Sequence, residues 1–180
     1  MGARPMKVLV TGGVRSGKSR HAEELLGTAD DVAYVAPGPS PEHDDADWAA
    51  RVAAHRAARP ANWVTHETPD LAGVLATTAG PVLVDCLGTW LTAVVDERDL
   101  WEASSDRVAG VVDALLDDVV AALAATASDV VLVTNEVGLG VVPAYRSGRL
   151  FRDLLGSVNQ RVASACDEVH LVIAGRVLRL

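Results

Sequence analysis

Cysteine, lysine and aromatic residues are all scarce in this chain of 180 residues, and each scarcity narrows the classes of protein it can belong to. The two cysteines, Cys86 and Cys166, belong to no CxxC pair, so neither a zinc site nor a disulfide framework is predicted. Acidic residues outnumber basic ones by 24 to 16, and a net charge of −8 argues against a nucleic-acid partner. No apolar run reaches the roughly 20 residues of a membrane span. Unpaired thiols suit a reducing compartment, so we expect a cytoplasmic protein.

The apolar half of the composition, 49% of residues, consists mainly of alanine, valine and leucine, because aromatic residues make up only 4%. Short valine-rich runs alternate with stretches typical of helices. Strands are predicted at residues 7–11, 32–36, 63–65, 81–85, 129–134 and 168–173, with a short edge strand at 177–180. Helices are predicted at residues 17–26, 44–57, 70–77, 89–95, 103–125 and 148–165. Because most of the strand runs are continuously apolar, we expect a mostly parallel sheet with helices on both faces, a three-layer α/β fold in one domain over residues 1–180.

Residues 12–19 read GGVRSGKS and match the phosphate-binding pattern G-x-x-x-x-G-K-[ST] between a predicted strand and a predicted helix. Glycines allow the backbone N–H groups to face phosphate oxygens, and the helix N-terminus adds positive potential. Lys18, one of only two lysines, is predicted to reach the β- and γ-phosphates, and Ser19 to bind Mg²⁺. The nucleotide-binding residues predicted here are Gly12, Gly13, Val14, Arg15, Ser16, Gly17, Lys18 and Ser19.

Asp85 closes the predicted strand at residues 81–85, the place where a magnesium-orienting carboxylate sits in P-loop proteins. The alternative is a helix N-cap, since aspartate often begins the helix that follows a strand. Glu136 has two interpretations as well. It belongs to a glycine-broken segment at residues 135–143, after a strand. Either it takes a proton from a substrate hydroxyl or binds a metal-linked water, or it caps a turn.

His55 lies on one face of the predicted helix at 44–57, together with Trp48 and Val52. One interpretation is a half-buried histidine that packs on the sheet. The other is a polyphosphate clamp, in which Arg56 and Arg59 next to the histidine bind phosphate oxygens.

Six segments resemble the bifunctional adenosylcobinamide kinase / adenosylcobinamide-phosphate guanylyltransferase family of cobalamin biosynthesis. They are VTGGVRSGKSRHAE at 10–23, YVA at 34–36, RVAAHRAARPANW at 51–63, VDCLGTWLT at 84–92, VLVTNEVGLGVVP at 131–143 and FRDLLGSVNQRVASACDEVHLVIAG at 151–175. The last two are the most specific. The chain departs from the family pattern at residues 36–38, which lack a hydroxyl, and at Gly88 and Ala93.

The resemblance implies a RecA-like P-loop domain that assembles as a trimer and acts on adenosylcobinamide. Family enzymes phosphorylate the aminopropanol hydroxyl of this corrinoid with ATP or GTP, and then transfer GMP from GTP to the new phosphate. The second reaction passes through a GMP-histidine intermediate, and the family's histidine matches His55, which with Lys18 forms the expected catalytic pair. Further nucleotide contacts are implied at Ala36, Pro37, Gly38, Arg56, Ala57, Ala58, Arg59, Glu67 and Asp85.

Two other functions fit a phosphate-binding loop. One is a P-loop kinase for a different small molecule, in which His55 is structural. The other is a nucleotide-dependent switch or a DNA-associated ATPase, which the acidic charge opposes.

Overall fold

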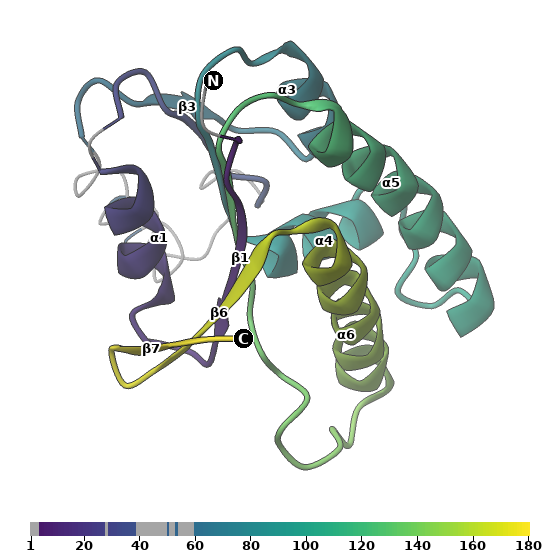
Figure 1. Ribbon diagram of the computed structural model, residues 1–180. Coiled ribbons are helices and arrows are strands. Elements are labelled where there is room, and N and C mark those ends of the chain that lie inside the picture. The colour runs from purple at the N-terminus through teal and green to yellow at the C-terminus, as the bar shows by residue number, and fades with distance from the viewer. Residues whose placement is uncertain (1–3, 28, 39–49, 51–52, 54–59) are drawn as a thin grey trace.

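A seven-stranded sheet forms the middle layer of the protein in the computed structural model, which describes residues 4–27, 29–38, 50, 53 and 60–180 (Figure 1). The strand order is β3-β2-β4-β5-β1-β6-β7, and of the described strands β7 alone runs antiparallel to its neighbour. The strands are β1 (Lys7–Gly12), β2 (Ala33–Val35), β3 (Val64–His66), β4 (Val82–Asp85), β5 (Val130–Val133), β6 (Glu168–Ile173) and β7 (Arg176–Arg179). Each strand expected from the sequence is present, with ends shifted by at most one residue.

Helices cover both faces of this sheet, as the sequence predicts (Figure 1). One face carries α1 (Lys18–Leu26), and the other carries α3 (Leu71–Thr77), α4 (Leu87–Asp96), α5 (Ser105–Ala125) and α6 (Arg146–Ala165). The expected three-layer P-loop arrangement is therefore confirmed. The helix predicted at 44–57 lies outside the described residues except for Ala50 and Ala53, which are helical.

Two apolar cores, one on each face, explain why the strands read as continuous apolar runs. In β4, Val82 and Val84 pack into the core beneath α3 to α6, whereas Leu83 packs into the core beneath α1. Val131 in β5 likewise faces α1, and its neighbours Val130 and Leu132 face the other core. Successive side chains of a strand point to opposite faces. In a strand that is covered on both faces every side chain is therefore buried, and its sequence is continuously apolar.

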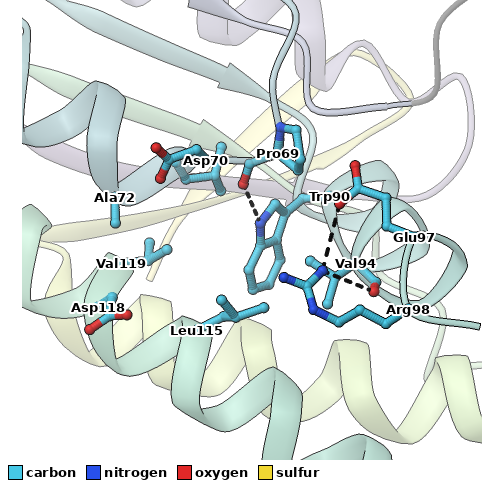
Figure 2. A pocket seen from close by; sticks show the side chains of 11 residues that line it. Pro69, Asp70, Ala72, Trp90, Val94, Glu97, Arg98, Leu115, Asp118 and Val119 are labelled. Carbon is cyan, nitrogen blue, oxygen red and sulfur yellow. Dashed lines mark hydrogen bonds and ion pairs between the residues drawn. The ribbon is translucent and has the colours of Figure 1, made fainter. Parts of the chain in front are cut away.

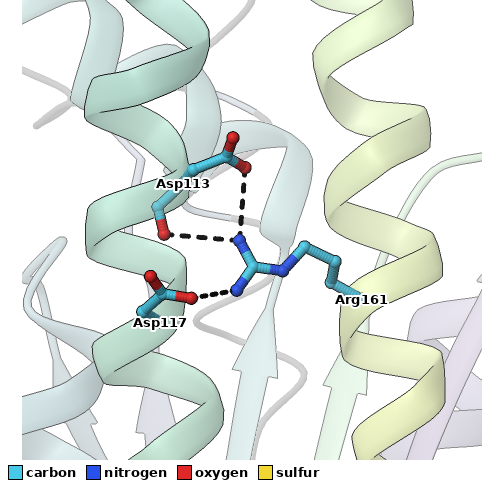
Figure 3. Close-up of polar contacts among 3 residues, drawn as sticks. All are labelled: Asp113, Asp117 and Arg161. Carbon is cyan, nitrogen blue, oxygen red and sulfur yellow. Dashed lines mark hydrogen bonds and ion pairs between the residues drawn. The ribbon is translucent and has the colours of Figure 1, made fainter.

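Polar contacts join the two longest helices at their exposed rim. Arg161 in α6 donates from Nη1 to Asp113 Oδ1 at 3.2 Å and from Nη2 to the Asp117 carboxylate (Figure 3). Both carboxylates are more than half exposed, so these ion pairs add little stability. The packing of α5 rests instead on five buried residues spaced three or four positions apart: Val108, Val112, Leu116, Val119 and Leu123.

A cavity of about 240 Å³ lies between α3, α4 and α5 (Figure 2). The Trp90 indole lies against it and donates from Nε1 to the Pro69 carbonyl at 3.0 Å. None of its lining residues belongs to the phosphate-binding loop or to the segment between β5 and α6. The cavity is thus separate from the candidate site described next.

Among the described residues, none of the helices has the length and apolarity needed to cross a membrane.

Candidate nucleotide site at the carboxyl edge of the sheet

The phosphate-binding loop turns directly from β1 into α1. Gly12 ends the strand where no side chain can fit, because a Cβ there would lie 2.4 Å from the Val172 carbonyl oxygen and 2.7 Å from Ser16 Oγ. Gly17, immediately before the helix, has φ 97°, a left-handed conformation that favours glycine. The two glycines of the motif are therefore required by the backbone geometry, one for close approach and one for its dihedral angle.

Backbone hydrogen bonds hold the loop from two sides. Gly175, in the turn between β6 and β7, donates its N–H to the Ser16 carbonyl at 2.8 Å. Glu136, just after β5, donates its N–H to the Gly12 carbonyl at 3.1 Å. Because β5 and β6 are the two neighbours of β1 in the sheet, the loop is supported by both adjacent strands. Figure 1 shows all three segments at the same end of the sheet.

The side chains of the loop leave polar groups ready for a ligand. Lys18 is only 9% exposed, and its Nζ donates to the Gly13 carbonyl at 3.2 Å. The hydroxyls of Thr11 and Ser16 are buried, and neither has a hydrogen-bond partner among the described residues. A buried hydroxyl without a partner is costly, and phosphate oxygens are acceptors that would satisfy the Ser16 hydroxyl. The loop residues therefore fit a nucleoside triphosphate.

Asp85 ends β4, which is separated from the loop-bearing strand β1 by β5. Its Oδ2 accepts a hydrogen bond from the Tyr34 hydroxyl at 2.9 Å, which fixes the orientation of the carboxylate. The N-cap alternative is wrong, because the capping residue of α4 is Cys86. A half-buried carboxylate at this edge and the Ser19 hydroxyl at the start of α1 are oxygen ligands of the kind Mg²⁺ takes.

The other expected nucleotide contacts follow the next two strands. Ala36, Pro37 and Gly38 follow β2, and Glu67 follows β3. The Ala36 N–H donates to the His66 carbonyl at 2.9 Å and joins the ends of these two strands. Since β1 to β4 are parallel to one another through the sheet, their carboxyl ends share one edge with the loop. The remaining expected residues lie outside the described part of the chain: His55, Arg56, Ala57, Ala58 and Arg59.

A polar network whose contacts the sequence does not predict lies at this edge. Thr134, which is fully buried, donates its hydroxyl to Asn159 Oδ1 at 2.6 Å. Asn159 Nδ2 donates to the Asn135 carbonyl at 3.1 Å, and Cys86 Sγ donates to Asn135 Oδ1 at 3.4 Å. The network ties the end of β5 to α6 and to the start of α4. Burial first, and the neighbouring Asp85 carboxylate second, raise the pKa of the Cys86 thiol, which suits a protonated donor.

Glu136 acts locally in this structure. Its Oε1 accepts the Gly138 N–H at 2.5 Å, the contact expected of a turn cap, and this favours the structural alternative for Glu136 over a catalytic base. Arg152 in α6 donates from Nη2 to the Gly138 carbonyl at 2.8 Å. The two side chains therefore bond to the same glycine, Glu136 to its N–H and Arg152 to its carbonyl.

A second network joins α1 to β6. His21 Nε2 lies 2.9 Å from His170 Nδ1, and His170 Nε2 lies 2.8 Å from Glu168 Oε2. His170 is 1% exposed with both ring nitrogens bonded. Desolvation, followed by the nearby His170, lowers the pKa of His21. Because each ring bonds to its neighbours within this network, we assign both histidines a structural role.

Comparison with known proteins gives consistent results. A family model described as "Cobinamide kinase / cobinamide phosphate guanyltransferase" matches residues 8–180. The "Bifunctional adenosylcobalamin biosynthesis protein CobU" of Salmonella typhimurium is 42% identical, over 94% of this chain and 97% of that protein. The CobU of Escherichia coli is 40% identical, also over 94% of this chain and 97% of that protein. The CobP of Pseudomonas aeruginosa is 38% identical over 94% of each. An ATPase of a bacterial type III secretion system shares the fold, with a TM-score of 0.54 at 12% identity over 93% of this chain and 51% of that one.

Proposed function

The chain belongs to the cobinamide kinase / cobinamide phosphate guanyltransferase family, and from this we propose that it is a bifunctional transferase of cobalamin biosynthesis. In the first reaction it transfers the γ-phosphoryl group of ATP or GTP to the aminopropanol hydroxyl of adenosylcobinamide. In the second it transfers GMP from GTP to adenosylcobinamide phosphate and releases pyrophosphate. The product is adenosylcobinamide-GDP.

The kinase half rests on one observation, the phosphate-binding loop with a buried lysine and an unpartnered buried hydroxyl. Lys18 neutralises charge on the β- and γ-phosphates, and the loop N–H groups orient them for in-line transfer. Ser19 and Asp85 would hold Mg²⁺, whose charge stabilises the transferring phosphoryl group. The observation supports phosphoryl transfer without specifying which hydroxyl accepts the group. The acceptor is assigned from the family.

The guanylyltransferase half assigns the nucleophile to His55. Attack of a neutral imidazole nitrogen on the α-phosphate of GTP forms a nitrogen–phosphorus bond and expels pyrophosphate. Transfer of GMP to the corrinoid phosphate then restores the free histidine. The intermediate divides the transfer into two steps, and in the first step a neutral nitrogen, in place of an anionic phosphate, attacks GTP. Arg56 and Arg59 have guanidinium groups whose geometry matches phosphate oxygens, and we assign them to the departing pyrophosphate or the incoming phosphate.

Labelled GTP tests this assignment. GTP labelled at the α-phosphate should label the protein covalently, and GTP labelled at the γ-phosphate alone should not. The bond should be labile to acid and stable to alkali, as a phosphorus–imidazole bond is. His55→Ala should lose the label and the guanylyl transfer while it keeps kinase activity. A label that persists in His55→Ala would exclude His55 as the nucleophile.

The same experiment separates the alternatives. A kinase for another small molecule would give no covalent label and no turnover of adenosylcobinamide. A switch protein or a DNA-associated ATPase would hydrolyse nucleotide without transferring it to a corrinoid. No described contact favours either alternative. The family also implies a trimer, and exposed apolar residues on or next to β6 and the edge strand β7 are compatible with subunit contact: Ile173, Val177, Leu178 and Leu180. A cytoplasmic location remains a prediction from the sequence.

A further inference from the structure

The segment between β5 and α6 exposes a concentration of apolar side chains. Five of them are exposed by 37%, 88%, 95%, 62% and 80% respectively: Val137, Leu139, Val141, Val142 and Tyr145. Single exposed apolar residues are common on soluble proteins, but a cluster this dense along one short segment is typical of a surface that binds another molecule. We name these five residues the β5–α6 apolar surface.

Side chains of α6 hold the backbone of this surface in place. Arg149 Nη1 donates to the carbonyls of Pro143 and Ala144 at 3.1 and 2.7 Å. Arg152 donates to the Gly138 carbonyl at 2.8 Å, so both ends of the segment are fixed to the same helix. A surface with a fixed backbone does not have to be ordered by its ligand, which reduces the entropic cost of binding.

This surface is continuous with the phosphate-binding loop. The segment begins at Glu136, whose N–H bonds to the Gly12 carbonyl at 3.1 Å. Leu139 is three residues further along, and a chain spans at most about 3.6 Å per residue, so its Cα lies within roughly 11 Å of that of Glu136. Val14 at the tip of the phosphate-binding loop is itself 73% exposed. Figure 1 shows the segment at the same end of the sheet as the loop.

We infer that the β5–α6 apolar surface binds the corrin ring of the corrinoid substrate and so directs its aminopropanol arm to the phosphate-binding loop. This inference rests on the proposed function. A corrin macrocycle is a wide ring with apolar faces and amides around its rim, and the hydroxyl that reacts is carried on a flexible arm. The ring is too large for the loop to enclose. It needs an apolar support outside the loop, while the arm reaches inward.

Charge on the same helix suits the second substrate. Arg146, Arg149 and Arg152 occur at every third position of α6, and all three donate to backbone carbonyls of neighbouring segments. Arg146 bonds to the chain between α4 and α5. Arg149 and Arg152 bond to the segment itself, so their positive charge lies along the base of the apolar surface. After the first reaction the corrinoid arm carries a phosphate, which this charge attracts.

A second copy of the chain is the competing occupant of the surface. Its position beside the phosphate-binding loop favours the substrate, because a subunit bound there would obstruct the approach of a large corrinoid. The exposed apolar residues of β6 and β7 offer a separate edge for subunit contact.

Serine substitutions test the inference in the full-length protein. Leu139 and Val141 are almost fully exposed, so the double variant Leu139→Ser/Val141→Ser should fold normally. The matched control is Val64→Ser on the edge strand β3, which β2 and β4 separate from β5, and there the valine is 54% exposed. The measurements are adenosylcobinamide binding by equilibrium dialysis, the KM for corrinoid and for nucleotide in the kinase reaction, and the molecular mass by sedimentation.

We expect the double variant to bind adenosylcobinamide at least about tenfold more weakly, since two side chains lose apolar contact. The nucleotide KM, kcat and molecular mass should match those of the wild type and of Val64→Ser. Unchanged corrinoid affinity in the double variant would overturn the inference while leaving the proposed function intact. A reduced mass with unchanged corrinoid affinity would overturn it too, and would assign the surface to a subunit contact. A wild-type protein that neither binds nor phosphorylates the corrinoid would instead overturn the proposed function.

Discussion

In the proposed kinase step single residues of the phosphate-binding loop stabilise the transferring phosphoryl group, and Lys18 is the one whose removal is easiest to interpret. Its ammonium is almost buried and is held within the loop by the Gly13 carbonyl. Lys18→Ala should lower kcat for both transfers by about 10²–10³-fold, the usual effect of losing one stabilising group in a site of this kind. Steady-state kinetics measure the loss, and circular dichroism checks that the variant is folded. Near-normal turnover by folded Lys18→Ala would exclude the loop as the reaction centre.

Metal binding by Asp85 can be tested with a substitution that keeps the size and shape of the side chain. In Asp85→Asn the amide oxygen can still accept the Tyr34 hydroxyl, but the negative charge is lost. The concentration of Mg²⁺ needed for half-maximal turnover should therefore rise, while nucleotide affinity measured without metal should change little. Tyr34→Phe is the complementary control, since it removes the hydrogen bond that Asp85→Asn can keep and leaves the charge of the carboxylate. An unchanged Mg²⁺ titration in Asp85→Asn would argue against a metal role.

At the scale of the elements, α6 is joined to the carboxyl end of β5 through the side chain of Asn159. Asn159→Ala leaves the fully buried Thr134 hydroxyl without its partner and frees the Asn135 carbonyl. A buried polar group that loses its partner costs about 1–3 kcal/mol, so the free energy of unfolding should fall by that amount. Urea denaturation provides the measurement. Gln160→Ala, one residue along on the exposed side of the same helix, should have almost no effect.

The central elements could be predicted from the sequence because β1, β2, β4 and β5 are buried on both faces, so their apolar runs mark the strands directly. The start of α4 could not be placed, since Cys86 is an unusual capping residue and its partner Thr89 lies within the helix. The phosphate-binding loop was evident because its chemistry is local. The network of Cys86, Asn135 and Asn159 was not, because it joins residues far apart in the chain. Strand order was equally hidden, since nothing in the sequence of β5 indicates that it lies between β4 and β1.

For the molecule as a whole, the stability at alkaline pH should depend on Cys166. Burial, and then the Asp167 carboxylate, raise the pKa of this thiol from 9.0 to about 12. The unfolded chain ionises at the lower pH, so the stabilisation is complete below pH 9 and is lost as the pH rises toward 12. One such group changes the free energy of unfolding by at most about 1.4 kcal/mol per pH unit.

Urea denaturation at several pH values between 8 and 11 should therefore show a steeper decline for the wild type than for Cys166→Ala. Other groups that titrate in this range are common to both proteins and cancel in the difference. Parallel curves for the two proteins would contradict the raised pKa of Cys166.

The hydrogen bond between the Gly175 N–H and the Ser16 carbonyl joins a segment synthesised late to one synthesised early, which matters during translation. The phosphate-binding loop, at residues 12–19, is synthesised more than 140 residues before β6 and about 155 residues before the turn at Gly175. A nascent chain that stops before β6 has the motif but lacks the strand that packs against Gly12 and the amide that bonds to Ser16. Nucleotide capture during translation must therefore wait until the ribosome has passed Gly175. A fused domain that displaces the β6–β7 turn should therefore weaken nucleotide binding, although this turn is far from the phosphate-binding loop in the sequence.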